Sequence, residues 1–287
     1  MRSEKEMLDF IITIANNDSR IRAAYLEGSR ANSNVLKDIF QDYDVVYIVT
    51  ETKSFIEDKN WIDQFGKRLY MQYPDENIYY SSDTENCYGW LIQFADGNRL
   101  DLHIKTLKNA LENIELYKTL VDKDNFMPQK EISSDEIYWV KKPSKEEFSF
   151  TCNEFWWCLN NVAKGLWRNE ILYVMDMINF QIRPMLRRIL EWKVGIENNF
   201  SVSVGKSAKY MNQYLNKKIY EQYLQSYSVA ETNALWNSVF IMCDLFNKIS
   251  LELSEKLNFT YNISEAENSS NFLKHVKDLP KNAKEIY

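Results

Sequence analysis

Three aspartates and a Gly-Ser turn are the residues of this 287-residue chain whose types and spacing could do chemistry. Gly28 and Ser29 come first, Asp42 and Asp44 follow as an Asp-x-Asp pair, and Asp101 lies in a later segment. Two carboxylates at contact distance repel by about 4 kcal/mol at an effective dielectric of roughly 20, so a cation should lie between them. Mg²⁺ prefers oxygen ligands and often combines carboxylates with phosphate oxygens. Three converging carboxylates therefore indicate a two-metal site for a nucleoside triphosphate.

The Gly-Ser turn is the candidate holder of the triphosphate. Gly28 lets the backbone approach a phosphate closely, and the Ser29 hydroxyl and the following amides supply donors if they begin a short helix. Arg30 would add positive charge. An alternative is that the turn is ordinary and that Asp42 and Asp44 only cap a strand, because each motif also occurs by chance. The combination of turn, acidic pair and third carboxylate favours the catalytic interpretation.

The elements around these residues should form a sheet. Residues 23–26 and 45–49, "AAYL" and "VVYIV", read as buried strands on either side of the turn. Residues 88–94 and 99–104 flank Asp96-Gly97, which predicts an antiparallel hairpin with a tight type I′ turn. A further signal, the capping box Ser-Glu-Lys-Glu at residues 3–6, predicts a first helix that runs to about residue 17. The predicted fold of this part is therefore an α/β domain, a mixed sheet flanked by helices.

The composition changes after about residue 139, and a second domain should begin there. Pro143 precedes a second capping box at residues 144–147, and most of the chain beyond that box has helical periodicity. We therefore predict an α/β domain over residues 1–142, which carries the three aspartates, and an all-α helical bundle over residues 143–287. Apolar residues from Ile171 onward predict a core helix that Pro184 kinks. The residues from 265 onward are polar and predict a loosely held tail.

Composition and charge exclude several classes of protein. The net charge of −6 argues against a nucleic-acid partner, because phosphate backbones are held by basic surface, and favours a small cationic ligand. Apolar runs are far shorter than about 18 residues and the first ten residues are charged, so we expect no membrane association and a cytoplasmic location. Four cysteines without C-x-x-C spacing and two histidines make a zinc site improbable. We expect a monomer.

A Gly-Lys-Ser triplet at residues 205–207 invites comparison with a P-loop. A P-loop requires glycine where this chain has Phe200, and the expected strand, loop and helix are missing around the triplet. Lys206 could still reach phosphate groups from the second domain, although a lysine in a surface loop is an equally good interpretation.

These motifs resemble the signature of the nucleotidyltransferase superfamily, in which Gly-Ser is followed by Asp-x-Asp and a third carboxylate on a later strand. Segments spread along the chain are similar to the aminoglycoside 6-adenylyltransferases, also called streptomycin adenylyltransferases. They include "RIRAAYLEGSRAN", "FQDYDVVY", "WIDQFGKRLYMQYP", "CNEFW", "KGLWRNEILY" and "WKVGIE". The resemblance covers nearly the whole chain and is more specific than the acidic motif alone.

The resemblance implies Mg²⁺-dependent transfer of AMP from ATP to the 6-hydroxyl of streptomycin. By the same resemblance, Asp42 and Asp44 are metal ligands and Asp101 is the third carboxylate or general base. Gly28 and Ser29 would hold the triphosphate, and Lys206 matches the family's Gly-Lys loop in the helical domain. Two alternatives remain at this stage: a nucleotidyltransferase that modifies a protein or tRNA, and a relative that binds its ligand without catalysis.

Overall fold

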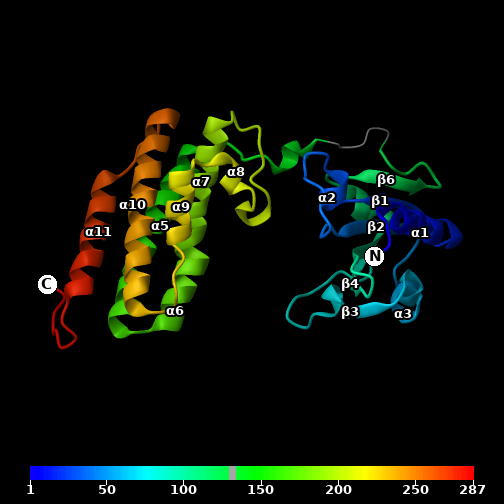
Figure 1. The fold of residues 1–287 in the computed structure, drawn as a ribbon, viewed down its shortest axis with the longest axis horizontal. Coiled ribbons are helices and arrows are strands. Elements are labelled where there is room, and N and C mark those ends of the chain that lie inside the picture. The colour runs from blue at the N-terminus through cyan, green and yellow to red at the C-terminus, as the bar shows by residue number, and fades with distance from the viewer. Residues whose placement is uncertain (129–133) are drawn as a thin grey trace. The chain divides into compact units, whose positions relative to one another are not determined.

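Six strands form one sheet in the first part of the chain, and helices form the second part (Figure 1). The structure is a computed structural model that describes residues 1–128 and 134–287. Contacts within the chain divide it into two compact units, Met1–Ile137 and Tyr138–Tyr287. The predicted fold class, a mixed α/β sheet domain followed by an all-α bundle, is confirmed.

The sheet has the strand order β3-β4-β5-β2-β1-β6. Among these strands, β2 and β5 pair in parallel and the other neighbouring pairs are antiparallel. Strands β1 and β2 are almost wholly buried, as their apolar sequences predict. The bounds are β1 Ile21–Leu26, β2 Tyr43–Val49, β3 Arg68–Gln72, β4 Cys87–Phe94, β5 Arg99–Thr106 and β6 Lys118–Asp122.

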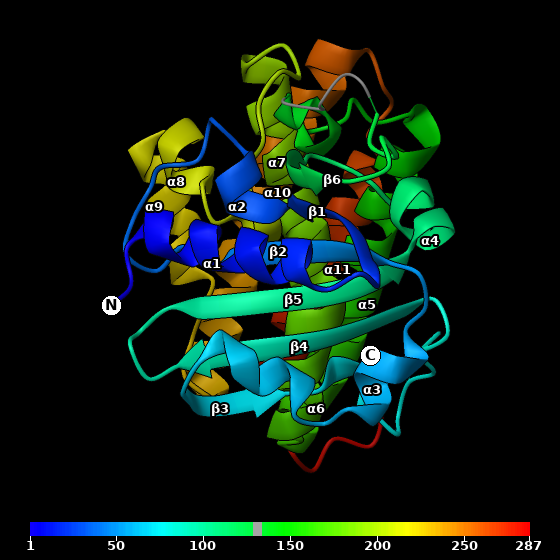
Figure 2. The same ribbon diagram turned by 90° about the vertical axis from the view of Figure 1, so that its right-hand side faces the viewer.

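Helix α1 covers one face of this sheet (Figure 2). Its predicted capping box is present, because the Ser3 side chain accepts from the Glu6 backbone and the Glu6 side chain accepts from the Ser3 backbone. The buried side chains of Met7 and Ile11 join the core cluster on this face. Helix α1 is Glu4–Asn17, and the other helices of the unit are short: α2 Gly28–Ala31, α3 Lys53–Glu57 and α4 Leu107–Glu112. The 3-10 turns are Trp61–Phe65 and Pro74–Glu76, and a third, Asp135–Tyr138, includes the last residues of the unit.

The hairpin between β4 and β5 forms as predicted, but its turn is of another type. The Gly97 amide donates to the Phe94 carbonyl, and the Phe94 amide donates to the Asn98 carbonyl. Gly97 has a φ of 91°, whereas Asp96 does not have a positive φ. A type I′ turn needs positive φ at both central residues, so the prediction of that turn was wrong. Gly97 instead comes at the end of the turn, and its positive φ returns the chain to the pairing of Asn98 with Phe94.

The helical unit is a bundle built around α5, α7, α10 and α11 (Figure 1). Its predicted capping box, Ser144 with Glu147, starts the first long helix. Stacked Phe155 and Phe246, with ring centroids 3.7 Å apart, lie in its core. The helices are α5 Lys145–Arg168, α6 Ile171–Asp176, α7 Arg183–Glu197, α8 Met211–Tyr214, α9 Lys217–Gln225, α10 Thr232–Leu257 and α11 Ile263–Asp278, with a 3-10 turn at Lys206–Ala208.

A change of helix type lies directly before Pro184, where we predicted a kink. A π-helical segment, Met177–Ile182, joins α6 to α7, and the Arg183 amide donates to the Ile178 carbonyl five residues back. Proline has no amide hydrogen to continue the α-helical ladder. The wider turn lies directly before Pro184, which falls in the first turn of α7.

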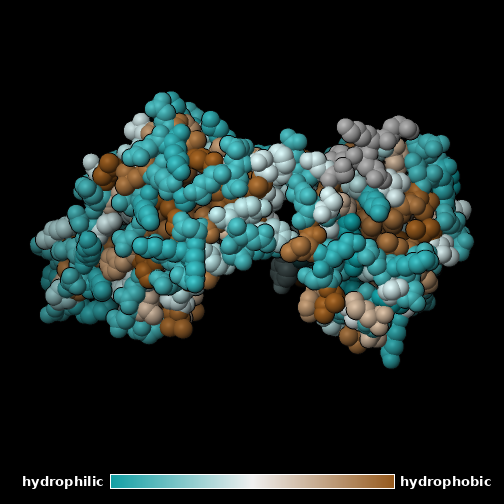
Figure 3. Space-filling model, turned by 45° about the horizontal axis from the view of Figure 1, so that its top comes forward, coloured by the Kyte–Doolittle hydropathy of each residue, from teal (hydrophilic) through white to brown (hydrophobic). Residues whose placement is uncertain are grey.

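The C-terminal segment is a helix, so the prediction of a loose polar tail from residue 265 was wrong. Helix α11 extends to Asp278, and Ala266, Leu273 and Val276 are buried in the bundle core. Three apolar residues spaced by seven and three positions are enough for one helix face, although the remaining residues are polar. In the described part of the chain, we find no helix whose length and apolar character would allow it to cross a membrane. The visible face of each unit is mostly hydrophilic, with separate apolar patches (Figure 3).

Candidate active site

The parallel pairing of β2 with β5 brings two of the predicted carboxylates together. Asp44 is the register partner of Asp101, and both side chains are half-buried. Asp42 lies two residues before Asp44, just outside the first residue of β2. Because side chains alternate along each strand, Asp44 and Asp101 lie on the sheet face opposite α1. The structure therefore shows that these segments meet, although they are almost sixty residues apart in the sequence.

The Gly-Ser turn lies directly beside Asp44. Gly28 has a φ of +63°, and a Cβ atom at this position would collide with the Asp44 carboxylate. The adjoining Glu27 amide donates to the Asp44 carbonyl at 2.9 Å. Glycine is needed here for two reasons: its left-handed backbone conformation and its close approach to an acid. The predicted short helix follows the turn as α2, with Ser29 half-buried in it.

Asp44 is the most electrostatically perturbed acid of this group. Burial raises its pKa to about 6, and the neighbouring charges of Asp101, Asp42 and Glu27 act in the same direction. The Arg99 guanidinium opposes this effect only in part. Among the described residues, Asp44 has no ion pair within 4 Å. A half-buried carboxylate in such surroundings gains from a cation that the polypeptide itself does not supply.

Arg99 supplies positive charge to the other two aspartates, and we did not predict it from the sequence. Its Nε and Nη2 atoms donate to the two Asp101 oxygens at 2.8 and 2.7 Å, and its Nη1 atom is 3.5 Å from Asp42 Oδ2. The signal was present in the sequence, since Arg99 lies two residues before Asp101 and therefore on the same face of the strand. The cation that we expected between the carboxylates is thus, in part, this guanidinium.

Arg30 braces the backbone that carries Asp42. Its guanidinium donates to the carbonyls of Gln41 and Asp42, both at 2.9 Å, and lies 3.7 Å above the Tyr43 ring. Only 9% of its side chain is exposed. Its Nη1 atom lies 3.5 Å from Glu4 Oε1. The predicted contact of Arg30 with a phosphate stays a prediction, and in this structure its guanidinium contacts the loop that carries Asp42.

A second ion pair extends the polar surface beyond the aspartates. Lys105 Nζ lies 3.7 Å from Glu27 Oε1, and Lys105 alternates onto the same sheet face as Asp101. Burial raises the pKa of Glu27, while the Lys105 charge opposes this change. His103 lies on this face as well, packed against Gly89, and burial lowers its pKa. Glu27 and Lys105 were also missed, because their pairing depends on the alignment of β1 with β2 and β5.

The chemistry of the aspartate group fits a hard divalent cation. Carboxylate oxygens are the ligands that Mg²⁺ prefers, and a guanidinium already stands in as a cation at two of these side chains. As the side chains are placed, residues 1–128 and 134–287 contain no group of three or more His, Cys, Asp or Glu that could hold a metal ion. In this arrangement both Asp101 oxygens accept hydrogen bonds from Arg99. The role of Asp42, Asp44 and Asp101 as metal ligands stays a prediction.

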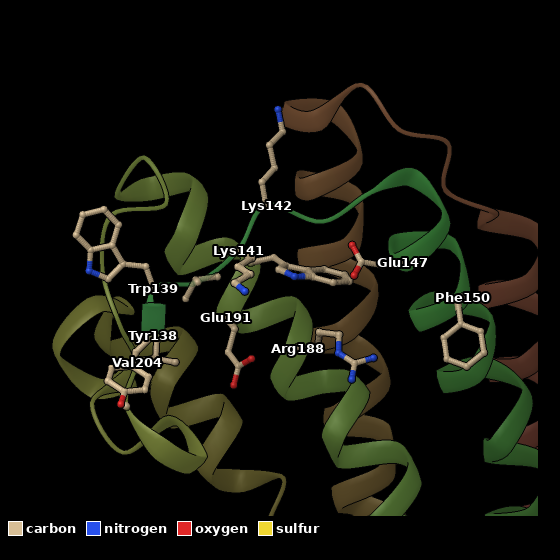
Figure 4. Close-up of a pocket in the computed structure, with 12 residues that line it drawn as sticks. Tyr138, Trp139, Lys141, Lys142, Glu147, Phe150, Arg188, Glu191 and Val204 are labelled. Carbon is tan, nitrogen blue, oxygen red and sulfur yellow. The ribbon is translucent and has the colours of Figure 1, made fainter. Parts of the chain in front are cut away.

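Lys206 belongs to the helical unit. It comes directly after Gly205, which lines a pocket of this unit. The pocket has a volume of about 630 Å³ and is lined by Gly205, by residues of the Tyr138–Lys142 segment, and by side chains of α5 and α7. Figure 4 shows Lys141, Lys142 and Arg188 around it, together with Glu147 and Glu191. Gly205 has a φ of 72°, and Lys206 itself is exposed. The loop therefore places an exposed lysine beside a pocket that is lined by three cationic and two acidic side chains.

Comparison with known proteins gives one consistent family. The family profile described as streptomycin adenylyltransferase matches residues 1–276. An aminoglycoside 6-adenylyltransferase of Bacillus subtilis (strain 168) is 42% identical over 265 residues, which are 91% of this chain and 93% of that protein. One from Staphylococcus aureus is 35% identical over 279 residues, covering 96% and 99% of the two chains. A crystal structure of an aminoglycoside 6-adenyltransferase from Bacillus subtilis aligns with 36% identity over 97% of this chain and 100% of that one, with a TM-score of 0.49.

Proposed function

The chain belongs to the streptomycin adenylyltransferase family and is a nucleotidyltransferase. From this premise, we propose that it transfers AMP from ATP to a hydroxyl group of an aminoglycoside. The acceptor that we propose is the 6-hydroxyl of streptomycin, and the result would be inactivation of the antibiotic. The observation that carries the proposal is the pairing of Asp44 with Asp101 beside Gly28.

Each residue of the site has a distinct part in this proposal. The turn at Gly28 and Ser29 binds the triphosphate, because the glycine leaves room beside Asp44 and the serine and the α2 amides are donors. Asp42 and Asp44, with Asp101 as the third carboxylate, would hold Mg²⁺, which supplies charge neutralisation at the phosphate oxygens when it is bound. Asp101 accepts the proton of the acceptor hydroxyl.

The proposed reaction is a direct in-line displacement. A bond forms between the acceptor oxygen and the α-phosphorus of ATP, and the bond from that phosphorus to the β-phosphate oxygen breaks. The acceptor proton goes to Asp101, and the electron pair leaves with pyrophosphate. Lys206, an exposed lysine of the helical unit, would neutralise part of the charge on pyrophosphate. Positioning and charge stabilisation are sufficient for such a transfer, so no covalent enzyme intermediate is required.

The acceptor is proposed from charge and from the names of the relatives. The chain carries a net charge of −6, and Asp42, Asp44 and Glu27 lie together at the site. An acidic site attracts a cationic sugar and repels nucleic acid. The similar proteins of Bacillus subtilis, Staphylococcus aureus and Campylobacter jejuni carry the name aminoglycoside 6-adenylyltransferase, which points to the same class of acceptor.

The test is an adenylylation assay with a panel of acceptors. Purified protein is incubated with ATP and Mg²⁺ together with streptomycin, spectinomycin, kanamycin or no acceptor, while pyrophosphate release is followed and the products are weighed by mass spectrometry. We expect streptomycin to gain one AMP, with the modified hydroxyl located by NMR. Asp42→Asn should reduce the rate by at least about 100-fold, since a metal ligand contributes several kcal/mol to such transition states.

A matched variant separates the site from general effects of charge. Asp9→Asn makes the same chemical change on the exposed face of α1, where Asp9 pairs with Lys5, and it should leave the rate unchanged. Wild-type turnover by the Asp42 variant would remove the proposed role of the cluster. If no member of the panel were adenylylated, the proposed acceptor class would be wrong.

A further inference from the structure

Arg99 holds two of the three carboxylates of the proposed metal site. It starts β5 and forms a two-pronged pair with Asp101, in which both oxygens accept a hydrogen bond from the guanidinium. The same side chain reaches Asp42 at 3.5 Å. A two-pronged arginine–carboxylate pair has a defined geometry, so Arg99 sets the direction in which the Asp101 oxygens point.

The charges of the cluster are unequal, which makes this guanidinium important. Asp42, Asp44 and Asp101 contribute three negative charges, and Arg99 contributes one positive charge. Lys105, which lies on the same sheet face, is paired with Glu27 instead. Without Arg99, the three carboxylates would lose the opposing charge that this guanidinium supplies, and their mutual repulsion would rise.

A metal ion and the guanidinium would use the same oxygens. Both Asp101 oxygens are bound to Arg99, and a divalent cation at this carboxylate would also lie within a few ångströms of a positive charge. The side chain of Arg99 is 44% exposed, so it is able to leave the cluster for solvent. The carboxylates with which it pairs are more buried, at 14% exposure for Asp101 and 33% for Asp42.

We propose that Arg99 is an exchangeable counter-ion of the site: it positions Asp42 and Asp101 and competes with the divalent cation for their oxygens. The inference rests on the proposed function, because it requires that these aspartates bind the metal. It makes Arg99 a positioning residue that sets metal affinity. The direction in which metal affinity changes on loss of Arg99 distinguishes this role from a structural one. The loss of a purely structural arginine would disorder Asp101 and weaken metal binding, whereas the loss of a competitor strengthens metal binding.

The test measures Mn²⁺ binding to the full-length protein by electron paramagnetic resonance and by calorimetry, without nucleotide. We expect Arg99→Gln to bind Mn²⁺ about tenfold more tightly than wild type, the effect of removing one charge-assisted competitor from partly exposed carboxylates. Arg99→Lys, which keeps the charge but loses the two-pronged geometry, should fall between them. The gain in Tm on adding Mn²⁺ should be larger for the Gln variant than for wild type.

Two further variants make the outcome unambiguous. Arg22 forms the same kind of two-pronged pair, with Asp124, outside the site, and Arg22→Gln should leave Mn²⁺ affinity unchanged. Asp44→Asn should weaken binding in either background. Equal or weaker Mn²⁺ binding by both Arg99 variants, with wild type binding in an Asp44-dependent way, would overturn the role of Arg99 and leave the metal site standing. Wild-type binding that does not depend on Asp44 would instead overturn the metal site and, with it, the role of Arg99.

Discussion

The two units of this protein each contain a cluster of buried charges, and the two clusters are built in opposite ways. In the helical unit, Lys193 is only 5% exposed and donates to Glu197 at 2.7 Å and to Glu252 at 2.8 Å. In the sheet unit the acids are the more buried partners and the cation, Arg99, is on the outside. One cluster encloses its cation, and the other holds its cation at a partly exposed position.

The pKa shifts follow this difference. Burial lowers the pKa of Lys193, but its hydrogen bonds to Glu197 and Glu252 outweigh burial and leave the pKa raised, so the charged form is favoured in the fold. Burial and like charges both raise the pKa of Asp44, so its charged form is disfavoured. A balanced cluster therefore supports the fold, whereas an unbalanced one is suited to bind a cation from outside.

The largest expected change in stability comes from breaking the balanced cluster. Lys193→Met removes the enclosed cation and leaves two half-buried carboxylates facing each other, which should lower the free energy of unfolding by about 2 to 4 kcal/mol. Urea unfolding measures this loss as a lower midpoint. The control is Lys256→Met, because Lys256 pairs with the same Glu252 but is 43% exposed, and it should change stability by no more than about 0.5 kcal/mol. Similar losses in the two variants would contradict the enclosed character of Lys193.

A smaller effect should follow from filling the space beside Asp44. Gly28→Ala introduces a Cβ that collides with the Asp44 carboxylate and places alanine at a positive φ, so we expect a loss of about 1 to 3 kcal/mol and strongly reduced AMP transfer. Gly97→Ala is the matched control, since Gly97 also has a positive φ but a Cβ there has nothing within 4 Å. It should show the backbone cost alone, at unchanged activity. Equal activity in the two variants would show that the contact with Asp44 has no catalytic importance.

The smallest effect is a pH dependence that belongs to Asp44. Its pKa is about 6 in the fold, above the ordinary value of 3.8, so between these pH values the folded protein binds more protons than the unfolded chain. The contribution of Asp44 to stability therefore falls as the pH rises from about 4 to 6. Asp44→Asn should remove this fall and be more stable than wild type at pH 7 by about 1 kcal/mol, measured by urea unfolding in metal-free buffer. A difference between variant and wild type that stays constant over this pH range would refute the shift.

Much of the fold followed from local patterns. The capping residues Ser3 and Ser144 start their helices as predicted, and the apolar runs at residues 23–26 and 45–49 are buried strands. Errors arose where distant contacts decide the outcome. Helix α11 is held by burial of Leu273 and Val276 in the bundle, which a mostly polar sequence does not reveal. The turn at Gly97 took a form set by the pairing of Phe94 with Asn98.

For the site, the amino-acid sequence by itself determined which groups are available: the glycine that permits a close approach, the acidic pair at a strand entrance and the third aspartate on a later strand. Their types and alternation are local properties, so they can be read along the chain. Only the tertiary structure decided that Asp44 faces Asp101, that Arg30 binds the loop before β2, and that Arg99 pairs with Asp101 and Asp42. Strand pairing and the pairing of buried charges both depend on residues that are far apart in the chain. No local sequence pattern specifies how close such residues come in the fold.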